Sequence, residues 1–375
     1  MACPPAHALV RLNDGRDQIH VTFSANVSSD SNVYANSDDK GDVIYSSGIT
    51  ADYVRRAGWI GVNASIAVSA ARFGEFNEEN YSNPSYSLEF TKQSGRTTGS
   101  VAFQAQRESR ADAAVNIRSE SWNYSSDLNV KYPINGVLSA AGMLGYSNRD
   151  YIDESLFSDL STYAASLDFF YVISSLRDLS VGYRYRYNET SRSTSAGDHG
   201  INVGMHGRLI RGVKGNLRVG YQTRKLDTGL PTDARFNSWT AGGSASYALG
   251  RRISLTGQIS KDFSVTATEA SVDSTSASLE MQFTANSRLS AGTSLGWGQS
   301  KFLGDTGRIV VSAGPPPVLG GQRQDDYLNL GGSLNFSLNE HLRLSASYSW
   351  FKNWSTLEYA DFVRNAWSVN MVSRW

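Results

Sequence analysis

Basic side chains recur at alternate positions in the middle of this 375-residue chain. Arg184 and Arg186 are separated by a single residue, His206 and Arg208 repeat that spacing, and Arg218 lies in the next polar run. Residues two apart in an extended chain point to the same side. If the three segments are neighbouring antiparallel strands, these groups form one basic patch on a shared face.

Acidic side chains occupy equivalent polar positions elsewhere in the sequence. Charges that face one another across a pore set its ionic selectivity. Two interpretations are open: these groups line a conduit, or they pair with one another or with infolded loops and hold the protein's shape. The members of this second set are Glu89, Asp127, Asp168 and Glu280, with the basic Lys131 near Asp127.

No catalytic arrangement is predicted. A hydrolase needs a nucleophile beside a histidine and a third group that orients the histidine. None of the five histidines has both a neighbouring acid and a neighbouring nucleophile in a long loop. We therefore expect neither enzymatic activity nor a cofactor. The histidines are His7, His20, His199, His206 and His341.

A metal site is not predicted either. The single cysteine, Cys3, cannot form an internal disulfide, and no Cys/His spacing suits a structural metal. Two acidic pairs, Asp38-Asp39 and Asp325-Asp326, fall in polar segments, where they either bind calcium or are simply solvated.

The composition restricts the class of protein that must position these groups. Lys and Arg number 35 and so do Asp and Glu, so the net charge is zero and no nucleic-acid partner is indicated. No run approaches 18 uncharged apolar residues, which excludes a helical membrane span. Gly, Tyr and Trp are nevertheless plentiful. Transmembrane barrels have such compositions, because only alternate residues of each strand face lipid.

A two-residue period runs through the whole chain and is clearest near its end. From 327 to 338, Leu, Leu, Leu, Phe and Leu alternate with Asn, Gly, Ser, Asn and Ser, and 342–350 repeats the pattern. A strand places two such sets on opposite faces, whereas a helix would mix them. About 18 segments of this kind can be counted.

The connections between these segments are of two kinds. Eight short turns, such as 211–212 and 250–251, alternate with nine longer polar loops, including 109–119, 188–198, 225–235 and 300–324. Bacterial outer-membrane barrels have this asymmetry, with short periplasmic turns and longer outward loops. The sequence therefore predicts an all-β, transmembrane, antiparallel up-and-down β-barrel of about 18 strands over residues 18–375. Residues 1–17 form an N-terminal tail, of which 1–8 resembles the remnant of a signal peptide.

A soluble β-sandwich is the competing architecture, and the apolar faces argue against it. Their central parts carry essentially no charge, although 70 charged residues had to be placed somewhere. An Arg or Lys facing lipid at the bilayer midplane would cost about 2–4 kcal/mol. Aromatic residues gather near both strand ends, as in the girdles that lie at headgroup level. The expected interfacial aromatics are Trp59, Tyr132, Trp239, Tyr247, Trp297, Trp350 and Trp375.

Two features resemble known barrel sequences. Trp375 ends an alternating strand that includes Trp367, Val369 and Met371, and this resembles the C-terminal signature that barrel-assembly machinery recognises. The run 21–34, with its Asp-Ser-Asn-Val-Tyr element, followed by a strand ending Tyr-Val-Arg-Arg at 53–56, resembles the β-barrel porin type 2 group. That group includes outer-membrane barrels encoded beside exopolysaccharide synthesis genes. The resemblance offers no catalytic residues to transfer.

The resemblance implies a location in the bacterial outer membrane and a role in transport. The expected function is a channel that exports a secreted polysaccharide, with outer-membrane lipid, the assembly machinery, the polysaccharide and a periplasmic export component as partners. One alternative is a general diffusion porin for small hydrophilic solutes, and another is a structural or adhesive barrel without conduction. The loop 300–324, with Gly314-Pro315-Pro316-Pro317, either folds over the mouth as a constriction or projects from the surface.

Overall fold

A computed structural model describes residues 8–56, 58–112, 117–152, 157–191, 194–227, 234–266, 268, 270–304, 308–312 and 318–375. Cys3, most of the 1–8 segment and Gly314–Pro317 lie outside these ranges. No helix in the described ranges is long and apolar enough to cross a membrane.

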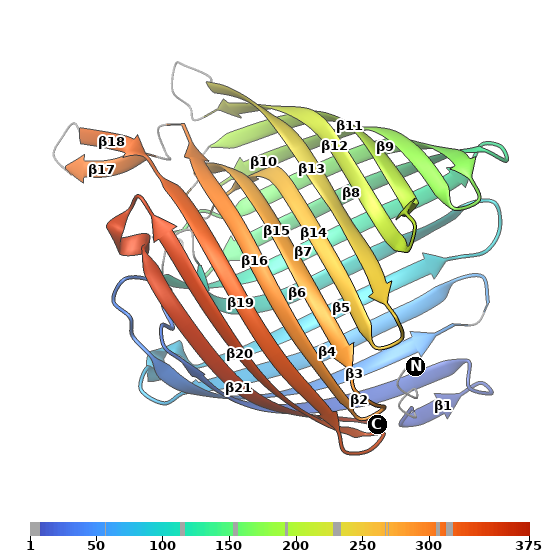
Figure 1. Ribbon diagram of the computed structural model, residues 1–375, viewed down its shortest axis with the longest axis horizontal. Helices are drawn as coiled ribbons and strands as arrows, with labels where there is room; N and C mark the ends of the chain where they lie inside the picture. Colours follow the sequence, from blue (N-terminus) through green and yellow to red (C-terminus); the bar gives the residue numbers. More distant parts are fainter. Residues whose placement is uncertain are drawn as a thin grey trace.

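The protein is a closed antiparallel barrel of 18 strands (Figure 1). Each strand pairs with the next along the chain, and the last strand pairs with the first from Thr22↔Arg374 to Asp30↔Ala366. Closure leaves no sheet edge open to the hydrocarbon of a membrane, which could not satisfy the hydrogen bonds of such an edge. The barrel strands are β2 (Asp17–Asp30), β3 (Asp42–Arg55), β4 (Gly61–Phe73), β5 (Tyr81–Lys92), β6 (Thr98–Asp112), β7 (Ile117–Pro133), β8 (Leu138–Tyr151), β9 (Leu160–Ser174), β10 (Arg177–Thr190), β11 (Ser195–Ile210), β12 (Val213–Asp227), β13 (Ala234–Leu249), β14 (Ile253–Val265), β15 (Ser271–Thr284), β16 (Leu289–Leu303), β19 (Gln324–Ser337), β20 (Leu342–Ser355) and β21 (Phe362–Arg374).

Five short elements lie outside this wall. The strand β1 (Val10–Leu12) pairs with the start of β2, so part of the predicted tail extends the sheet at the turn end. Within the predicted loop 300–324, β17 (Arg308–Ser312) and β18 (Val318–Gln322) form a hairpin that extends beyond the loop end of the barrel (Figure 1). The single 3-10 turns are η1 (Asn77–Glu79) and η3 (Glu358–Ala360).

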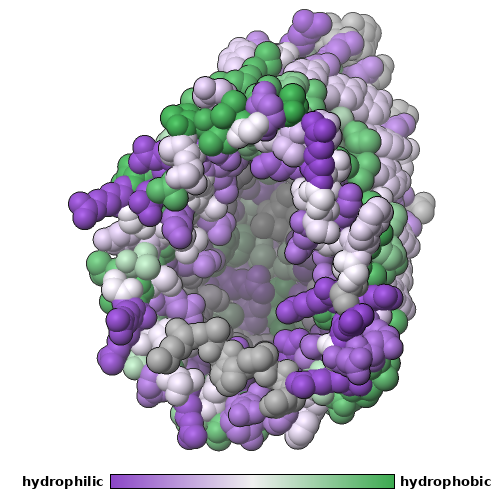
Figure 2. Space-filling model, turned by 90° about the vertical axis from the view of Figure 1, so that its right-hand side faces the viewer, coloured by the Kyte–Doolittle hydropathy of each residue, from purple (hydrophilic) through white to green (hydrophobic). Residues whose placement is uncertain are grey.

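The register places the predicted apolar faces on the outside. Leu330 pairs with Leu295 and Trp350, and Val203 pairs with Val181 and Val219. Leu330 is 43% exposed and Val203 is 53% exposed. Hydrophobic residues gather on the outside of the barrel around a hydrophilic interior (Figure 2), so both side chains belong to the outer face. Leu344 shares this outer face through its pairing with Phe336. An apolar band therefore surrounds the barrel, as a lipid-facing wall requires.

The strands continue well past the membrane on the loop side. They contain 12 to 17 residues, whereas about 9–11 residues suffice to span a bilayer. The predicted loops 109–119, 188–198 and 225–235 were therefore too wide. Backbone pairing persists beyond the apolar band, where both faces of a strand are polar and the alternation that marks a strand disappears.

The packed apolar core lies at this loop end rather than in the middle of the barrel. Val33, Ala71 and Phe73 are buried there, with Tyr34 and Phe76 against them. Asp42, at the loop end of β3, accepts hydrogen bonds from the backbone N–H groups of residues 43, 74, 75 and 76. Burial by itself raises the pKa of Asp42, but these four donors together lower it below its usual value.

Candidate functional site: the lumen and its loop end

The interior of the barrel is hollow and polar. Figure 2 shows the molecule from the side of the turns, with an open, largely hydrophilic interior and hydrophobic residues on the outside. On the inner wall, one recess of ≈ 410 Å³ is lined by residues that include Gln104, Asn123 and Ser147. Another recess, of ≈ 370 Å³, is lined largely by Ser, Thr, Gly and Gln of β14 to β20, with Glu280 as its charged residue.

At the loop end, one part of the wall turns into this interior. β13 and β14 are paired only as far as Ala241↔Lys261. Beyond that point β13 remains paired with β12, while β14 remains paired with β15 up to Val265↔Ser271. The sheet therefore divides. We call the separated ends of β14 and β15, residues 262–265 and 271–273, the tucked end.

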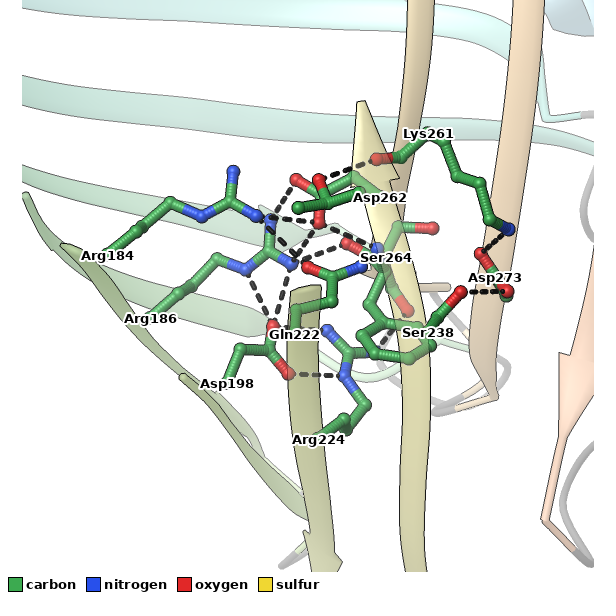
Figure 3. A network of polar contacts seen from close by, with 12 residues as sticks. Arg184, Arg186, Asp198, Gln222, Arg224, Ser238, Lys261, Asp262, Ser264 and Asp273 are labelled. Carbon is green, nitrogen blue, oxygen red and sulfur yellow. Dashed lines mark hydrogen bonds and ion pairs between the residues drawn. The ribbon is translucent and has the colours of Figure 1, made fainter. Parts of the chain in front are cut away.

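Arginines of β10 and β12 attach the tucked end to the inner wall (Figure 3). Arg186 donates to Asp262 at 3.2 Å and to the backbone carbonyl of Phe263 at 2.6 Å. Arg184 also reaches Asp262, at 3.0 Å. Arg224 donates to the carbonyl of Ser264 at 2.7 Å.

A buried carboxylate holds two of these arginines in place. Asp198 of β11 accepts from Arg186 at 2.7 Å and from Arg224 at 2.6 Å (Figure 3). The side chains of Arg224 and Asp198 are 0% and 3% exposed. Charges so far from water are stable only when paired and fully hydrogen-bonded, and Arg224 meets this condition through Asp198, Ser264 and Ser271.

The outer face of the tucked end is covered by β13. Ser238 donates to Asp273 at 2.9 Å, and Lys261 forms an ion pair with Asp273 at 2.7 Å. The ammonium of Lys261 lies 5.2 Å from the ring centre of Trp239. The tucked end thus lies inside β13 and against β10 to β12, where it occupies part of the lumen.

The charges of this network almost cancel. Three arginines (184, 186 and 224) meet two aspartates (198 and 262), which leaves one positive charge. Arg184 and Arg186 belong to the predicted pore-lining set, but the sequence interpretation missed Asp198, Arg224 and Asp262. Asp198 and Arg224 continue the inward alternation of their strands, and that continuation was the signal that could have identified them.

Glycines shape the wall farther from the loops. The carboxylate of Asp168 lies directly against the backbone of Gly182. Any residue with a β-carbon at position 182 would clash, because that β-carbon would come within 1.8 Å of the carboxylate and within 3.2 Å of the side-chain amide of Asn202. Arg218 lies over Gly242. Asp168, Arg184, Asn202 and Arg218 line a recess of ≈ 140 Å³. Among the described residues, Arg218 has no hydrogen-bond partner and no ion-pair partner, although the carboxylate of Asp168 lines the same recess.

The other predicted pore-lining residues are distributed around the wall. Lys131 lies 5.0 Å from the ring centre of Phe170, which contacts His206, and His206 is 3.1 Å from the hydroxyl of Ser180. Glu89 accepts from Asn63 across β4 and β5. Asp127 faces Gly145 of β8, and Arg208 accepts a hydrogen bond from Arg177 through its carbonyl. A role for these groups in conduction stays a prediction.

Several other predicted groups have structural partners. Asp325 pairs with Arg323, and Asp39 accepts from Asn32. Within the described ranges, no group of three or more His, Cys, Asp or Glu side chains is placed to hold a metal ion. His341 stacks on Trp375 with 4.2 Å between ring centres.

The expected girdle aromatics of the turn side lie at or near strand ends, whereas Trp239, Trp297 and Trp350 lie well inside β13, β16 and β20. Trp59 and Tyr132 are exposed near the turns, each beside a cation, and Trp239 is exposed toward the loops. Tyr247 and Trp375 lie at the turn end, and Trp297 and Trp350 share the outer face through their pairings with Leu328 and Leu330.

Comparisons with known proteins support the architecture. The FrpB iron transporter of Neisseria meningitidis (F5-1 variant, apoprotein form) aligns with a TM-score of 0.52 and 11% identity, over 89% of this chain and 61% of FrpB. The chain thus spans about three fifths of FrpB. OccK2 (OpdF) of Pseudomonas aeruginosa aligns with a TM-score of 0.51 and 10% identity, over 96% of this chain and 98% of OccK2.

This likeness concerns the fold. The chain is an outer-membrane β-barrel. The apolar band, the closed sheet and the asymmetry of turns and loops place it in the outer membrane of a Gram-negative bacterium. No family model and no curated protein matches the sequence, so the resemblance to the β-barrel porin type 2 group stays a prediction.

Proposed function

We propose that this barrel is a passive channel for small hydrophilic solutes. The observation that carries the proposal is the inner wall of β14 to β20, where Ser, Thr, Gly and Gln line a continuous recess with one carboxylate, Glu280. Short polar side chains replace water without strong binding, and conduction requires solutes that leave as readily as they enter. Barrels of 16–18 strands are wide enough for an aqueous channel.

The general-porin alternative is favoured over polysaccharide export. OccK2, which matches this chain over nearly its whole length, has been solved in complex with glucuronate, a small sugar acid. The tucked end also occupies part of the lumen at the loop end, which suits a small solute better than a hydrated polymer. Two arginines, Arg184 and Arg218, outnumber the one carboxylate, Asp168, in their recess, and we expect this excess to favour anionic solutes.

Cysteine accessibility tests whether the lumen is water-filled. In a Cys3→Ser background, Ser347→Cys places a thiol on the inner wall and Ala346→Cys places one on the lipid face of the same strand. A charged methanethiosulfonate reagent should label the first in reconstituted vesicles and slow glucose-driven swelling. The second should resist the reagent and leave swelling unchanged. Equal labelling of both positions, or none of either, would contradict a hydrated lumen.

A further inference from the structure

Positive charge is concentrated at the turn end of the barrel. The turn rim comprises the eight short turns and the adjoining ends of the chain. It holds 15 of the 35 basic side chains but only four of the 35 acidic ones, a net charge of +11 in a chain whose total is zero. The remainder of the chain therefore carries −11. The rim covers residues 10–20, 53–56, 92–98, 133–138, 174–178, 208–214, 249–253, 284–289, 337–343 and 372–375.

The rim and the loop end differ in how their cations are paired. Cations at the loop end are commonly paired, as Arg118 is with Glu79 and Arg323 with Asp325. By contrast, several exposed arginines of the rim have no ion-pair partner among the described residues. Six of them are Arg56, Arg211, Arg251, Arg252, Arg288 and Arg374. Uncompensated surface charge of one sign attracts a partner of the opposite sign.

The rim also lies at the level of an aromatic girdle. The ammonium of Lys92 is 5.6 Å from the ring centre of Trp59, and the guanidinium of Arg96 is 4.8 Å from that of Tyr132. Both rings are exposed on the outer face, where aromatic side chains lie among lipid headgroups. The turns are short, so their cations stay close to the ends of the strands. The phosphates of the adjacent leaflet are therefore within reach.

We propose that the turn rim binds the phosphate headgroups of anionic phospholipid in the periplasmic leaflet. Seven of the eight turns carry at least one basic residue at or beside the turn, the exception being 133–137, and these turns are spread around the whole circumference (Figure 1). A ring of lipid contacts every side of a barrel, whereas a protein partner would contact one side. Short turns also present little projecting surface to which a protein partner could bind. Charge attraction to anionic lipid would fix the depth and orientation of the barrel.

Spin-labelled lipids measure this preference directly. The intact protein is reconstituted in phosphatidylcholine vesicles with trace spin-labelled phosphatidylglycerol or phosphatidylcholine, and the motionally restricted fraction gives their relative association. We expect phosphatidylglycerol to be favoured by about threefold. The variant R211Q/R251Q/R288Q should reduce that preference below twofold. A matched variant, R72Q/R235Q/K301Q, removes three exposed outward cations at the loop end and should leave the preference unchanged.

The outcomes separate the alternatives. Equal association of the two lipids with the unaltered protein would overturn the proposal. So would equal losses in both triple variants, because the effect would then reflect total charge rather than the rim. Co-sedimentation with peptidoglycan, lost in R211Q/R251Q/R288Q and accompanied by no lipid preference, would assign the rim to the cell wall instead. Vesicles containing any of these proteins should swell in glucose at the same rate. The proposal of a channel and the proposal of lipid binding by the turn rim can therefore be refuted independently.

Discussion

Removal of the carboxylate of Asp198 should destabilise the barrel strongly, because this carboxylate holds the arginines that attach the tucked end at the loop end. Asp198 accepts from Arg186 and Arg224, and neither side chain of the Arg224–Asp198 pair is more than 3% exposed. Loss of this carboxylate leaves the buried cation of Arg224 without an ion-pair partner, while Arg186 keeps Asp262, and breaking a buried pair in this way costs about 3–5 kcal/mol. Asp198→Ala should therefore lower the free energy of unfolding by that amount. Urea titration of the protein in lipid vesicles, followed by tryptophan fluorescence, measures the change.

Two comparisons make the reasoning refutable. Asp150→Ala removes an exposed aspartate with no ion pair among the described residues, and it should cost less than about 0.5 kcal/mol. In the double variant Asp198→Ala/Arg224→Met, the cost should fall short of the sum of the single changes by at least about 1 kcal/mol, because the two groups interact directly. A loss below about 1 kcal/mol for Asp198→Ala, or strict additivity, would show that the network does not hold the tucked end.

Three further changes test other parts of the structure. Leu330→Arg places a charge at the middle of an outward face and should cost about 2–4 kcal/mol of folding free energy in vesicles. Ser333→Arg, on the inner wall of the same strand, should cost little, and equal costs for the two variants would contradict the assigned faces. Asp42 has a lowered pKa, so its contribution to stability is present above the unfolded value near 3.9 and is lost as the pH falls through the folded value. Asp42→Asn should flatten the stability profile below about pH 4, and an unchanged acid slope would refute this role. Changing both Arg208 and Arg218 to Ala should shift the reversal potential in a salt gradient away from anion preference, and an unchanged potential would leave them as structural groups.

The sequence was informative about the wall because lipid imposes a simple rule on it. Each membrane-facing residue must be apolar and each inward neighbour is free to be polar, so strands such as 327–338 and the total of 18 followed from alternation alone. Leu330, Val203 and Leu344 lie on the predicted outer face for this reason. The short turns were equally predictable, since they separate two regular runs.

The loop end could not be predicted in the same way. Outside the bilayer both faces of a strand meet polar surroundings, and the pattern no longer distinguishes strand from loop. Asp198 and Asp262 were therefore not recognised as inward groups, although Arg184 and Arg186 were. The division of the sheet between β13 and β14 depends on contacts between residues 76 positions apart, as between Arg186 and Asp262, and no local pattern encodes such a contact.

Single-channel recording in planar bilayers tests the central claim most directly. If the protein is a passive channel, the membrane conductance should rise in discrete steps as single channels insert. The current should be proportional to voltage without added ligand, and the reversal potential in a salt gradient should show a preference for anions. Its vesicles should swell at rates that decrease as the sugar becomes larger, from glucose to short oligosaccharides. Protein that is folded by circular dichroism and inserted in the bilayer, yet neither conducts ions nor admits glucose, would contradict the account.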